Sequence, residues 1–203
     1  MIAVIDYGMG NLRSVEKALE VAGGKILVVS DRKGIEGCDK LVFPGVGSFG
    51  DAMKELKARR LIDPIKDAIK SGKPFLGLCL GLQLLFKKSE EAPGVRGLGI
   101  LEGEVKRFRP GALKVPHMGW NNIEIRGQMP ENRILDKIPN NSYMYFVHSY
   151  YVKPEDKGVV LTTTDYGIKF VSAVARNNIY GLQFHPEKSQ VVGLKILKNF
   201  VRL

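Results

Sequence analysis

The chain has 203 residues, 44% of them hydrophobic and 26% charged, with a formal net charge of +10. This length is enough for one well-buried α/β domain, so we expect a single domain over residues 1–203. The sequence has no apolar run long enough to span a membrane and no signal-peptide pattern, which predicts a cytoplasmic protein without a membrane partner. We therefore expect Cys38 and Cys79 to be free thiols, and the lack of Cys-x-x-Cys or His-x-x-x-His spacing argues against a metal site.

The positive charge is compatible with nucleic acid or another acidic partner. The lysines and arginines are spread along the chain, however, with no run of five. Because net charge governs solubility and association more than fold, we favour a solvated enzyme surface and expect no nucleic-acid partner. A nucleic-acid-binding protein is an alternative that rests on charge alone.

The first part of the chain alternates short apolar runs with a helical pattern, as α/β folds do. The pattern predicts strands over residues 2–5, 25–29 and 40–43 and a helix over 12–21. The pair Gly8-x-Gly10 lacks the third glycine of a dinucleotide-binding loop, because Arg13 occupies that position. A dinucleotide site is therefore not favoured.

The third predicted strand leads into a glycine-rich loop, Pro44-Gly45-Val46-Gly47-Ser48-Phe49-Gly50. Such a loop between a strand and a helix can turn backbone N–H groups toward an anion. A Walker phosphate loop is excluded because its Gly-Lys-Ser/Thr ending is absent. The loop is therefore either an oxyanion hole or a plain turn, and the helix after it is interrupted or restarted at Pro64.

Residues 74–86 carry apolar runs on both sides of the pentapeptide Gly77-Leu78-Cys79-Leu80-Gly81. This pattern predicts a buried strand, an abrupt turn and a buried helix. On such a corner the residues two before and two after the nucleophile come close together, and glycine has no Cβ to collide. Cys79 would lie at the first turn of the helix, where the N-terminal dipole favours the reactive thiolate. The alternative is a buried cysteine with glycines that serve only tight packing.

From Gly99 onward the pattern changes to short strands and turns, which predicts antiparallel additions to the parallel sheet. Residues 89–97 are predicted to form a loop, as are residues 115–121, whose Trp120 is either a structural plug or part of a partner surface. The remaining predicted elements are strands at 105–108, 123–125, 143–147 and 159–164, a hairpin of 172–176 and 179–184 around Asn177-Asn178, and a helix at 191–201. The predicted fold class is α/β, with an open, mostly parallel central sheet, flanking helices and added antiparallel strands.

His185 is the candidate for the base that a cysteine nucleophile needs. Pro186 pushes it toward an extended conformation, in which residues two apart face the same way. The Glu187 carboxylate can therefore reach the His185 ring, fix its tautomer and stabilise the imidazolium. The alternative is an ordinary loop after a strand. His117 and His148 lack such a carboxylate and are interpreted as structural or interface groups.

Three motifs together resemble the class I, triad-type glutamine amidotransferases: the cysteine pentapeptide, the tetrapeptide Phe184-His185-Pro186-Glu187 and the loop Pro44-Gly45-Val46-Gly47. Within that family, the blocks at 79–86, 116–121, 146–150 and 185–189 are similar to the glutaminase subunits of imidazole glycerol phosphate synthases. The resemblance runs the full length of the chain. It implies a single amidotransferase domain with flavodoxin-like layering that serves L-histidine biosynthesis.

The resemblance implies that Cys79 attacks the carboxamide of L-glutamine to give a glutamyl thioester and ammonia, while His185 shuttles the proton and Glu187 orients it. The positions that match the oxyanion hole are the backbone of Val46 and Leu80. The positions that match the glutamine-binding residues are Gly47, Gln83, Ser149 and Tyr150. Ser149 and Leu82 replace a common threonine and methionine with their chemistry preserved. No cofactor or metal is implied.

The implied partner is the cyclase subunit, a β/α barrel that forms a heterodimer with the glutaminase. It uses the ammonia to make imidazole glycerol phosphate and an aminoimidazole carboxamide ribotide. Residues in segments that face the cyclase in the family are Asn11, Pro116, Met118, Trp120, Tyr145 and Lys188. Because glutaminases of this family are idle until the partner binds ligand, we hypothesise that the Gly45–Val46 peptide is the switch, since flanking glycines permit a flip.

A glutaminase that serves another acceptor, as in pyridoxal phosphate synthesis, is an alternative that the block at 116–121 argues against. A non-catalytic regulator on the same fold is a second alternative. Such a protein would be expected to have lost the thiol, the imidazole or the carboxylate, and all three are present.

Overall fold

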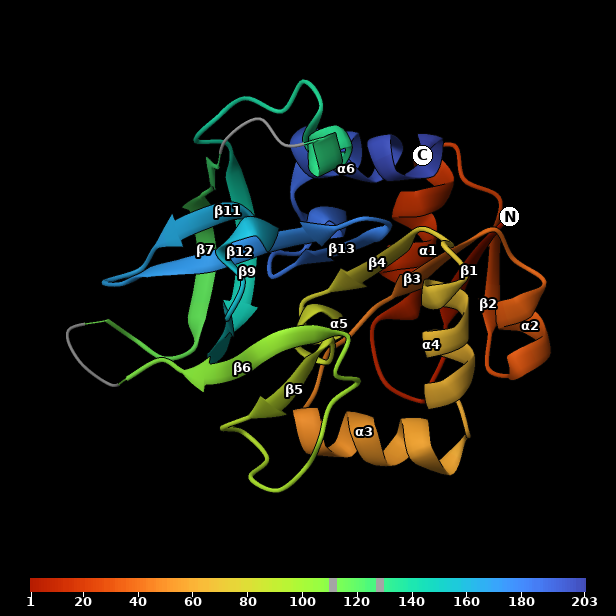
Figure 1. Ribbon diagram of the computed structural model, residues 1–203. Coiled ribbons are helices and arrows are strands. Elements are labelled where there is room, and N and C mark those ends of the chain that lie inside the picture. Colours follow the sequence, from red (N-terminus) through yellow and green to blue (C-terminus); the bar gives the residue numbers. More distant parts are fainter. Residues whose placement is uncertain (110–112, 127–129) are drawn as a thin grey trace.

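The computed structural model describes residues 1–109, 113–126 and 130–203, and its centre is an eleven-stranded sheet (Figure 1). Five adjacent strands of this sheet are parallel to one another. In spatial order they are β2 (Ile26–Val29), β1 (Ile2–Ile5), β3 (Lys40–Phe43), β4 (Phe75–Leu78) and β13 (Ile179–Leu182). The order of these five strands is that of flavodoxin-like folds, in which ligands bind beyond the carboxyl ends of the strands.

The rest of the sheet is mostly antiparallel and continues from β13. The path runs through β12 (Lys169–Arg176), β10 (Tyr150–Pro154) and β6 (Leu101–Arg107) to β5 (Phe86–Ser89), which is parallel to β6. Two further strands extend this sheet: β11 (Val160–Asp165) pairs with β12, and β8 (Glu124–Ile125) pairs with β11. A separate antiparallel pair consists of β7 (His117–Asn122) and β9 (Tyr143–His148).

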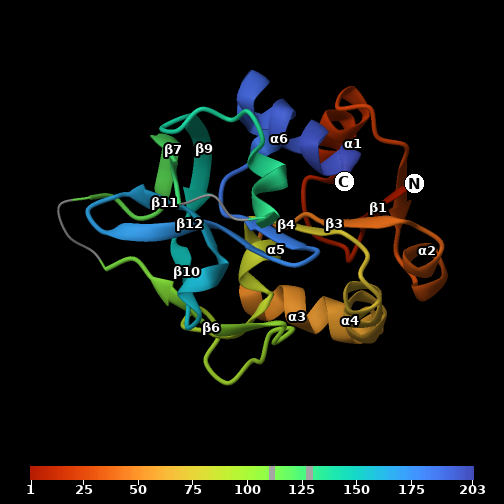
Figure 2. The same cartoon turned by 45° about the horizontal axis from the view of Figure 1, so that its top comes forward.

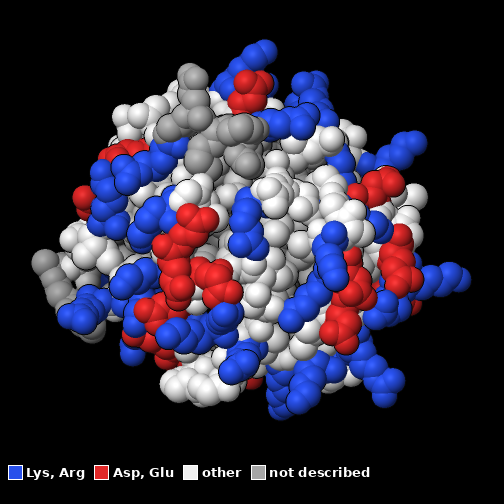
Figure 3. Space-filling view, in the orientation of Figure 1, with Lys and Arg blue, Asp and Glu red and all other residues white. Residues whose placement is uncertain are grey.

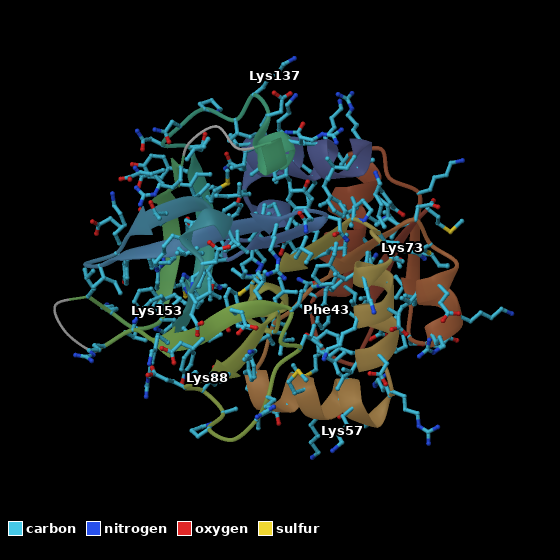
Figure 4. All side chains as sticks on the ribbon, viewed as in Figure 1. Phe43, Lys57, Lys73, Lys88, Lys137 and Lys153 are labelled. Carbon is cyan, nitrogen blue, oxygen red and sulfur yellow. The ribbon has the colours of Figure 1, made fainter. Side chains whose placement is uncertain are left out.

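Helices cover both faces of the parallel strands (Figure 2). One face packs against α1 (Leu12–Val21), α6 (Gln190–Arg202) and the 3₁₀ turn η1 (Pro130–Leu135), and the other against α2 (Arg32–Glu36), α3 (Phe49–Ala58) and α4 (Ile62–Lys70). The short elements are α5 (Leu80–Gln83), η2 (Lys157–Val159) and η3 (Pro186–Lys188). Apolar side chains pack into one cluster on each face. The fully buried Phe43 lies among the interior side chains, whereas Lys57 and Lys137 extend outward at the periphery (Figure 4).

The structure confirms the predicted α/β class and most of the predicted elements. The hairpin of β12 and β13 turns at Asn177-Asn178, with Arg176 paired to Ile179 and Asn177 in the left-handed region. Pro64 lies in the first turn of α4, where a missing N–H costs no hydrogen bond. The prediction that a helix restarts near this proline is therefore confirmed.

Two local predictions were wrong. The helix after Cys79 ends at Gln83, and Phe86 starts an edge strand instead, because Phe86 pairs with Leu101 of β6. The predicted loop at 115–121 is largely strand β7, in which His117 pairs with His148. In both cases pairing with a strand distant in the sequence overrode the local pattern. The helix at 32–36 and the strand at 150–154 were not predicted.

The corner after β4 depends on close backbone contacts between neighbouring strands. A Cβ at Gly81 would lie 2.2 Å from the carbonyl oxygen of Phe43 in β3, and one at Gly77 would lie 2.6 Å from the carbonyl oxygen of Gly81. A Cβ at Gly45 would lie 2.7 Å from the Gly81 nitrogen. These three glycines therefore let the loop after β3 lie directly against the corner that carries Cys79.

We expect the substitution Gly81→Ala to lower the free energy of unfolding by about 1–3 kcal/mol or more, because the new methyl group forces the backbone of β3 and α5 apart. Gly37→Ala is the control, since Gly37 has a negative φ and its Cβ would come no closer than 3.3 Å to a neighbouring atom. Urea unfolding of both variants measures the effect. Equal midpoints would contradict the role given to Gly81.

Candidate active site

Cys79 lies at the corner between β4 and α5 in a strained backbone conformation. Its φ is 51° and its ψ is −103°, a combination that residues with a Cβ rarely adopt. Its N–H donates to the carbonyl oxygen of Leu182 at 2.7 Å, which ties the corner to the end of β13. The fold therefore projects the thiol from the carboxyl edge of the parallel strands.

His185 and Glu187 follow β13, the strand next to β4. The Nδ1 atom of His185 and Oε1 of Glu187 are 2.8 Å apart, and the two side chains are only 4% and 3% exposed. Main-chain contacts fix the segment, because the His185 N–H donates to the carbonyl oxygen of Tyr145 and the Ser189 hydroxyl donates to that of His185. The geometry thus brings the predicted imidazole and carboxylate together.

The His185 ring is protonated at neutral pH. Burial lowers its pKa, but hydrogen bonding and charge interactions with Cys79 and Glu187 outweigh burial and raise the pKa to about 10. Nε2, the other ring nitrogen, is buried on the side of the Cys79 sulfur and has no other hydrogen-bond partner among the described residues. A cation beside the sulfur, with a spare N–H, can both stabilise a thiolate and deliver a proton.

A cavity of about 330 Å³ opens beside these groups. It is lined by Gly45, Val46, Gly47, Cys79, Leu80, Gln83, Glu91, Pro116, Val147, His148, Ser149, Tyr150 and His185. Every predicted oxyanion and glutamine-binding position therefore faces one cavity. Glu187 lies behind His185, outside the lining.

The predicted oxyanion donors are not both available in this conformation. The Leu80 N–H donates to the carbonyl oxygen of Gly45 at 3.4 Å. In a trans peptide the C=O and N–H bonds point in opposite directions, so the Val46 N–H points away from Leu80. The Gly45 carbonyl thus lies where a negatively charged oxygen would need a donor.

Sequence reasoning missed two residues at the site. Gln183, at the end of β13, donates from Nε2 to the Cys79 sulfur at 3.5 Å. Glu91 comes from the loop after β5 and accepts from the Phe49 N–H at 2.7 Å, at the start of α3. Burial raises the pKa of Glu91, with a smaller opposing effect from that hydrogen bond. Only the fold brings Glu91 to the cavity and Gln183 to the buried side of the sulfur, although Gln183 lies two residues before the predicted base.

Tyr7 is a further buried group beside the nucleophile. It is fully buried in the loop after β1, and its hydroxyl has no hydrogen-bond partner among the described residues. Burial and the neighbouring charge of Cys79 raise its pKa, so the phenol stays neutral.

His117 and His148 form a buried pair on β7 and β9 rather than part of an exposed surface. Nδ1 of His117 lies 3.0 Å from Nε2 of His148, and aromatic rings such as Phe146 and Phe170 surround them. Burial lowers the pKa of His117 to about 4 and is the main cause that lowers the pKa of His148 to about 3. Both rings are neutral at physiological pH.

Four of the predicted interface residues form a continuous surface, which we call the β7–β9 surface: Met118, Trp120, Tyr145 and Lys188. Met118 and Trp120 are 66% and 47% exposed. The Trp120 and Tyr145 ring centroids are 6.0 Å apart, and Lys188 Nζ lies 5.7 Å from the Tyr145 centroid. Pro116 lies one residue before β7 and lines the cavity, so the surface adjoins the site.

Asn11, the other predicted interface residue, caps α1 by accepting from the Ser14 N–H. It is exposed on a helix that lies against η3, the turn that carries Lys188. Within the ranges that the structure describes, no three His, Cys, Asp or Glu side chains are grouped to hold a metal ion. No helix among the described residues could cross a bilayer.

A thiol on a strand-to-helix corner, next to a buried imidazole held by a carboxylate, defines a cysteine-dependent amidase type of site. The family described as "Glutamine amidotransferase class-I" matches residues 3–203 of the chain. A protein of Aquifex aeolicus called "Imidazole glycerol phosphate synthase subunit HisH" is 56% identical to this chain, over 98% of this chain and 95% of that protein. A protein of Methanococcus maripaludis called "Imidazole glycerol phosphate synthase subunit HisH 1" is 48% identical, over the whole of both chains. The chain belongs to the class-I glutamine amidotransferases and, within them, to the HisH family. It is a glutamine amidotransferase enzyme.

Solved structures agree with the fold. A structure titled "Crystal structure of glutamine amidotransferase" has a TM-score of 0.77 at 20% identity and covers all of both chains. The "Structure of PurLQS from Thermotoga maritima" has a TM-score of 0.72 at 19% identity, over 99% of this chain and 97% of that one. At such identities the likeness concerns the fold alone.

The two neutral histidines predict a loss of stability in mild acid. The pKa values of His117 and His148 are below their ordinary value of 6.5, so between pH 6 and pH 5 the unfolded chain takes up protons that the folded chain does not. His185, whose pKa is raised, acts in the opposite direction, but mainly above pH 6.5, so it offsets little of the loss between pH 6 and pH 5. The free energy of unfolding should fall by up to about 1.4 kcal/mol per pH unit for each neutral histidine.

Urea unfolding at pH 6.0 and pH 5.0 measures this loss. His117→Asn removes one of the two titrating rings and should reduce the difference between the two pH values. Equal unfolding free energies of the unaltered protein at both pH values would contradict the burial of two neutral imidazoles.

Proposed function

We propose that the chain hydrolyses L-glutamine to glutamate and ammonia through Cys79, His185 and Glu187. The observation that carries this proposal is the position of the His185 ring, hydrogen-bonded to Glu187 on one side and next to the Cys79 thiol on the other, at the wall of the 330 Å³ cavity. The name of the HisH relatives and the family match support the same chemistry.

The reaction then has two halves. The Cys79 thiolate attacks the amide carbon of glutamine, and His185 gives its proton to the leaving nitrogen, so that ammonia leaves and a glutamyl thioester forms. Water attacks the thioester while His185 takes up one of its protons. The thiolate leaves, and glutamate is released. Glu187 holds the Nδ1–H throughout and stabilises the imidazolium.

The cavity wall offers groups of the right chemistry for the rest of the substrate. We assign Gly47, Gln83, Ser149 and Tyr150 to the glutamine head group, as their lining positions support. Glu91 adds a carboxylate for the α-ammonium group of glutamine. Burial raises the pKa of Glu91 because it disfavours the ionised carboxylate, and a cation in the cavity would stabilise that ionised form.

The Gly45–Val46 peptide is the proposed activation switch. Its carbonyl accepts from the Leu80 N–H, so rotation of this peptide would free that donor and present a second one from Val46. Gly45 has no side chain to hinder the rotation, and a Cβ there would collide with the Gly81 nitrogen. Because a missing oxyanion donor typically costs about 100- to 1,000-fold in rate, the conformation described here would be a slow one.

The proposed partner is the cyclase subunit of imidazole glycerol phosphate synthase, a β/α barrel that receives the ammonia in a heterodimer serving L-histidine biosynthesis. The names of the relatives support this assignment. The β7–β9 surface, with Pro116 at the cavity and Asn11 on α1, supplies the exposed apolar groups that such an interface needs.

We further propose that the chain is one amidotransferase domain, which the match over residues 3–203 and the continuous sheet support. A cytoplasmic location fits two free cysteines, Cys38 and Cys79. Figure 3 shows acidic side chains interspersed among the lysines and arginines on the face in view, as expected of a solvated surface rather than a nucleic-acid groove.

Ammonia release from glutamine tests the function. We expect little release by the chain alone and at least a 100-fold rise when the cyclase subunit and its ribonucleotide ligand are added, because the oxyanion peptide then rotates. Cys79→Ala is the control and should abolish release. Equal rates with and without the liganded cyclase would contradict the switch, and release that ignores the cyclase would point to another ammonia acceptor. No release under any condition would exclude the triad.

Trp120→Ala should weaken the complex with the cyclase about 30-fold or more, since a large exposed aromatic at an interface centre is typically worth about 2 kcal/mol. Titration calorimetry measures the dissociation constant. Tyr143→Ala is the matched control, because Tyr143 is 62% exposed at the far end of the same strand pair. An unchanged dissociation constant for Trp120→Ala would place the interface elsewhere, and equal weakening by both substitutions would contradict the central position given to Trp120.

A further inference from the structure

A continuous chain of hydrogen bonds runs behind the nucleophile, and the proposed reaction does not use it. It starts at the Cys79 sulfur, which accepts from Gln183 Nε2 at 3.5 Å. The Gln183 Oε1 atom accepts from Gln83 Nε2 at 3.2 Å, and the same nitrogen donates to the carbonyl oxygen of Tyr150 at 3.0 Å. That carbonyl also accepts from His148 Nδ1 at 2.8 Å. These hydrogen bonds therefore link β9, β10, α5 and the residue after β13 to the sulfur.

The Tyr150 carbonyl sets the direction of the bonds toward Cys79. A carbonyl oxygen only accepts, so Gln83 must present its amide nitrogen to it. The second hydrogen of that nitrogen points to Gln183 Oε1. The Gln183 amide is thereby oriented with its nitrogen, and not its oxygen, toward the sulfur.

The same carbonyl sets the direction on the histidine side. His148 must carry its proton on Nδ1, so its neutral ring accepts at Nε2 from His117 Nδ1 at 3.0 Å. His117 then accepts at Nε2 from the Asn121 amide at 3.3 Å, and that amide also donates to the Asp165 carbonyl at 2.8 Å. Every donor meets an acceptor only while both rings are neutral, which agrees with their lowered pKa values.

We propose that Gln183 is a further catalytic residue that donates an N–H to the Cys79 sulfur, and that Gln83, His148 and His117 are positioning residues that hold its amide in the donating orientation. A donor at 3.5 Å favours the thiolate that attacks and that later leaves the thioester, whereas the amide oxygen in its place would repel it. This inference deepens the proposed glutaminase mechanism and rests on it.

The arrangement also defines how Gln83 contacts the substrate. Both hydrogens of its amide nitrogen bond to the protein, one to Tyr150 and one to Gln183. Only its Oε1 remains for the cavity, so Gln83 accepts a hydrogen bond from glutamine rather than donating one.

The rate of Cys79 alkylation by iodoacetamide, followed from pH 5 to pH 10 by peptide mass spectrometry, reports the thiolate without glutamine. The titratable groups beside the sulfur are His185 and Tyr7, with Glu187, His148 and Glu91 around them. We expect Gln183→Glu to slow alkylation at pH 7 at least about tenfold and to move the profile to higher pH, because an acceptor replaces the donor. Gln183→Leu should give a smaller shift in the same direction.

Two controls separate this effect from a loss of structure. Thr162→Val removes a buried hydrogen bond to Ser172 that is not part of the series of hydrogen bonds behind Cys79. This substitution should leave the alkylation profile unchanged. Cys38, the other buried thiol, reports unfolding in every variant by its own alkylation. Profiles of both Gln183 variants that match the unaltered protein would overturn the donor role.

The positioning role is tested at His148 by two amides of different reach. Asn places a donor at the position of Nδ1 and keeps the bond to Tyr150, whereas Gln reaches the position of Nε2 and loses it. We expect His148→Asn to retain most of the alkylation rate at pH 7 and His148→Gln to lose about tenfold. If packing alone matters, the larger Gln will match or exceed Asn, and the positioning role is overturned.

The proposed function and the role of Gln183 fail on different outcomes. If the unaltered chain with its liganded cyclase releases no ammonia, the glutaminase proposal fails whatever the alkylation profiles show. If ammonia is released but the Gln183 variants keep the unaltered profile, only the role of Gln183 fails.

Discussion

The close approach of backbone between the ends of β3 and β4 is the constraint on which the site depends. Gly81 lies so near the Phe43 carbonyl that no side chain fits between them, and a side chain at Gly45 would likewise collide with the Gly81 nitrogen. This contact holds Cys79 in its left-handed conformation and sets the loop after β3 beside it. The same closeness lets the Gly45 carbonyl accept from the Leu80 N–H, so the corner both presents the nucleophile and withholds an oxyanion donor.

The three histidines show how burial acts on chemically identical groups with different partners. His185 is buried against a carboxylate and a thiol, and its pKa rises to about 10. His117 and His148 are buried against each other and against aromatic rings, and burial lowers the pKa of His117 to about 4 and that of His148 to about 3. The His185 imidazole is therefore charged at neutral pH beside the sulfur. The neutral rings of His117 and His148 each donate one hydrogen bond and accept one.

The β7–β9 pair connects the site with the surface. Its inward side chains, His117 and His148, take part in the hydrogen-bond chain to Cys79, and its outward side chains, Met118 and Trp120, are exposed. Alternation along a strand places these two functions on opposite sides of the same backbone. A protein that binds the outer side would contact the strand that anchors the inner hydrogen bonds.

The sequence by itself determined the features that depend on neighbours in the chain. The alternation of apolar runs predicted the α/β class, and the spacing of Gly77, Cys79 and Gly81 predicted the corner. The tripeptide from His185 to Glu187 predicted the oriented imidazole, although the expected extended segment was wrong: Glu187 reaches the His185 ring from the 3₁₀ turn η3. The motifs resembling the amidotransferases identified the family that the comparisons confirm.

Only the tertiary structure decided the features that join distant segments. Strand pairing turned Phe86 and His117 into strand residues against the local prediction, since β6 and β9 supplied the partners. The fold also brought Glu91 to the cavity and aligned Gln83, Gln183 and His148 around the Tyr150 carbonyl. No local pattern encodes the bonds of Gln83 to Tyr150 and to Gln183, because these residues lie far apart in the sequence and become neighbours only when the sheet assembles.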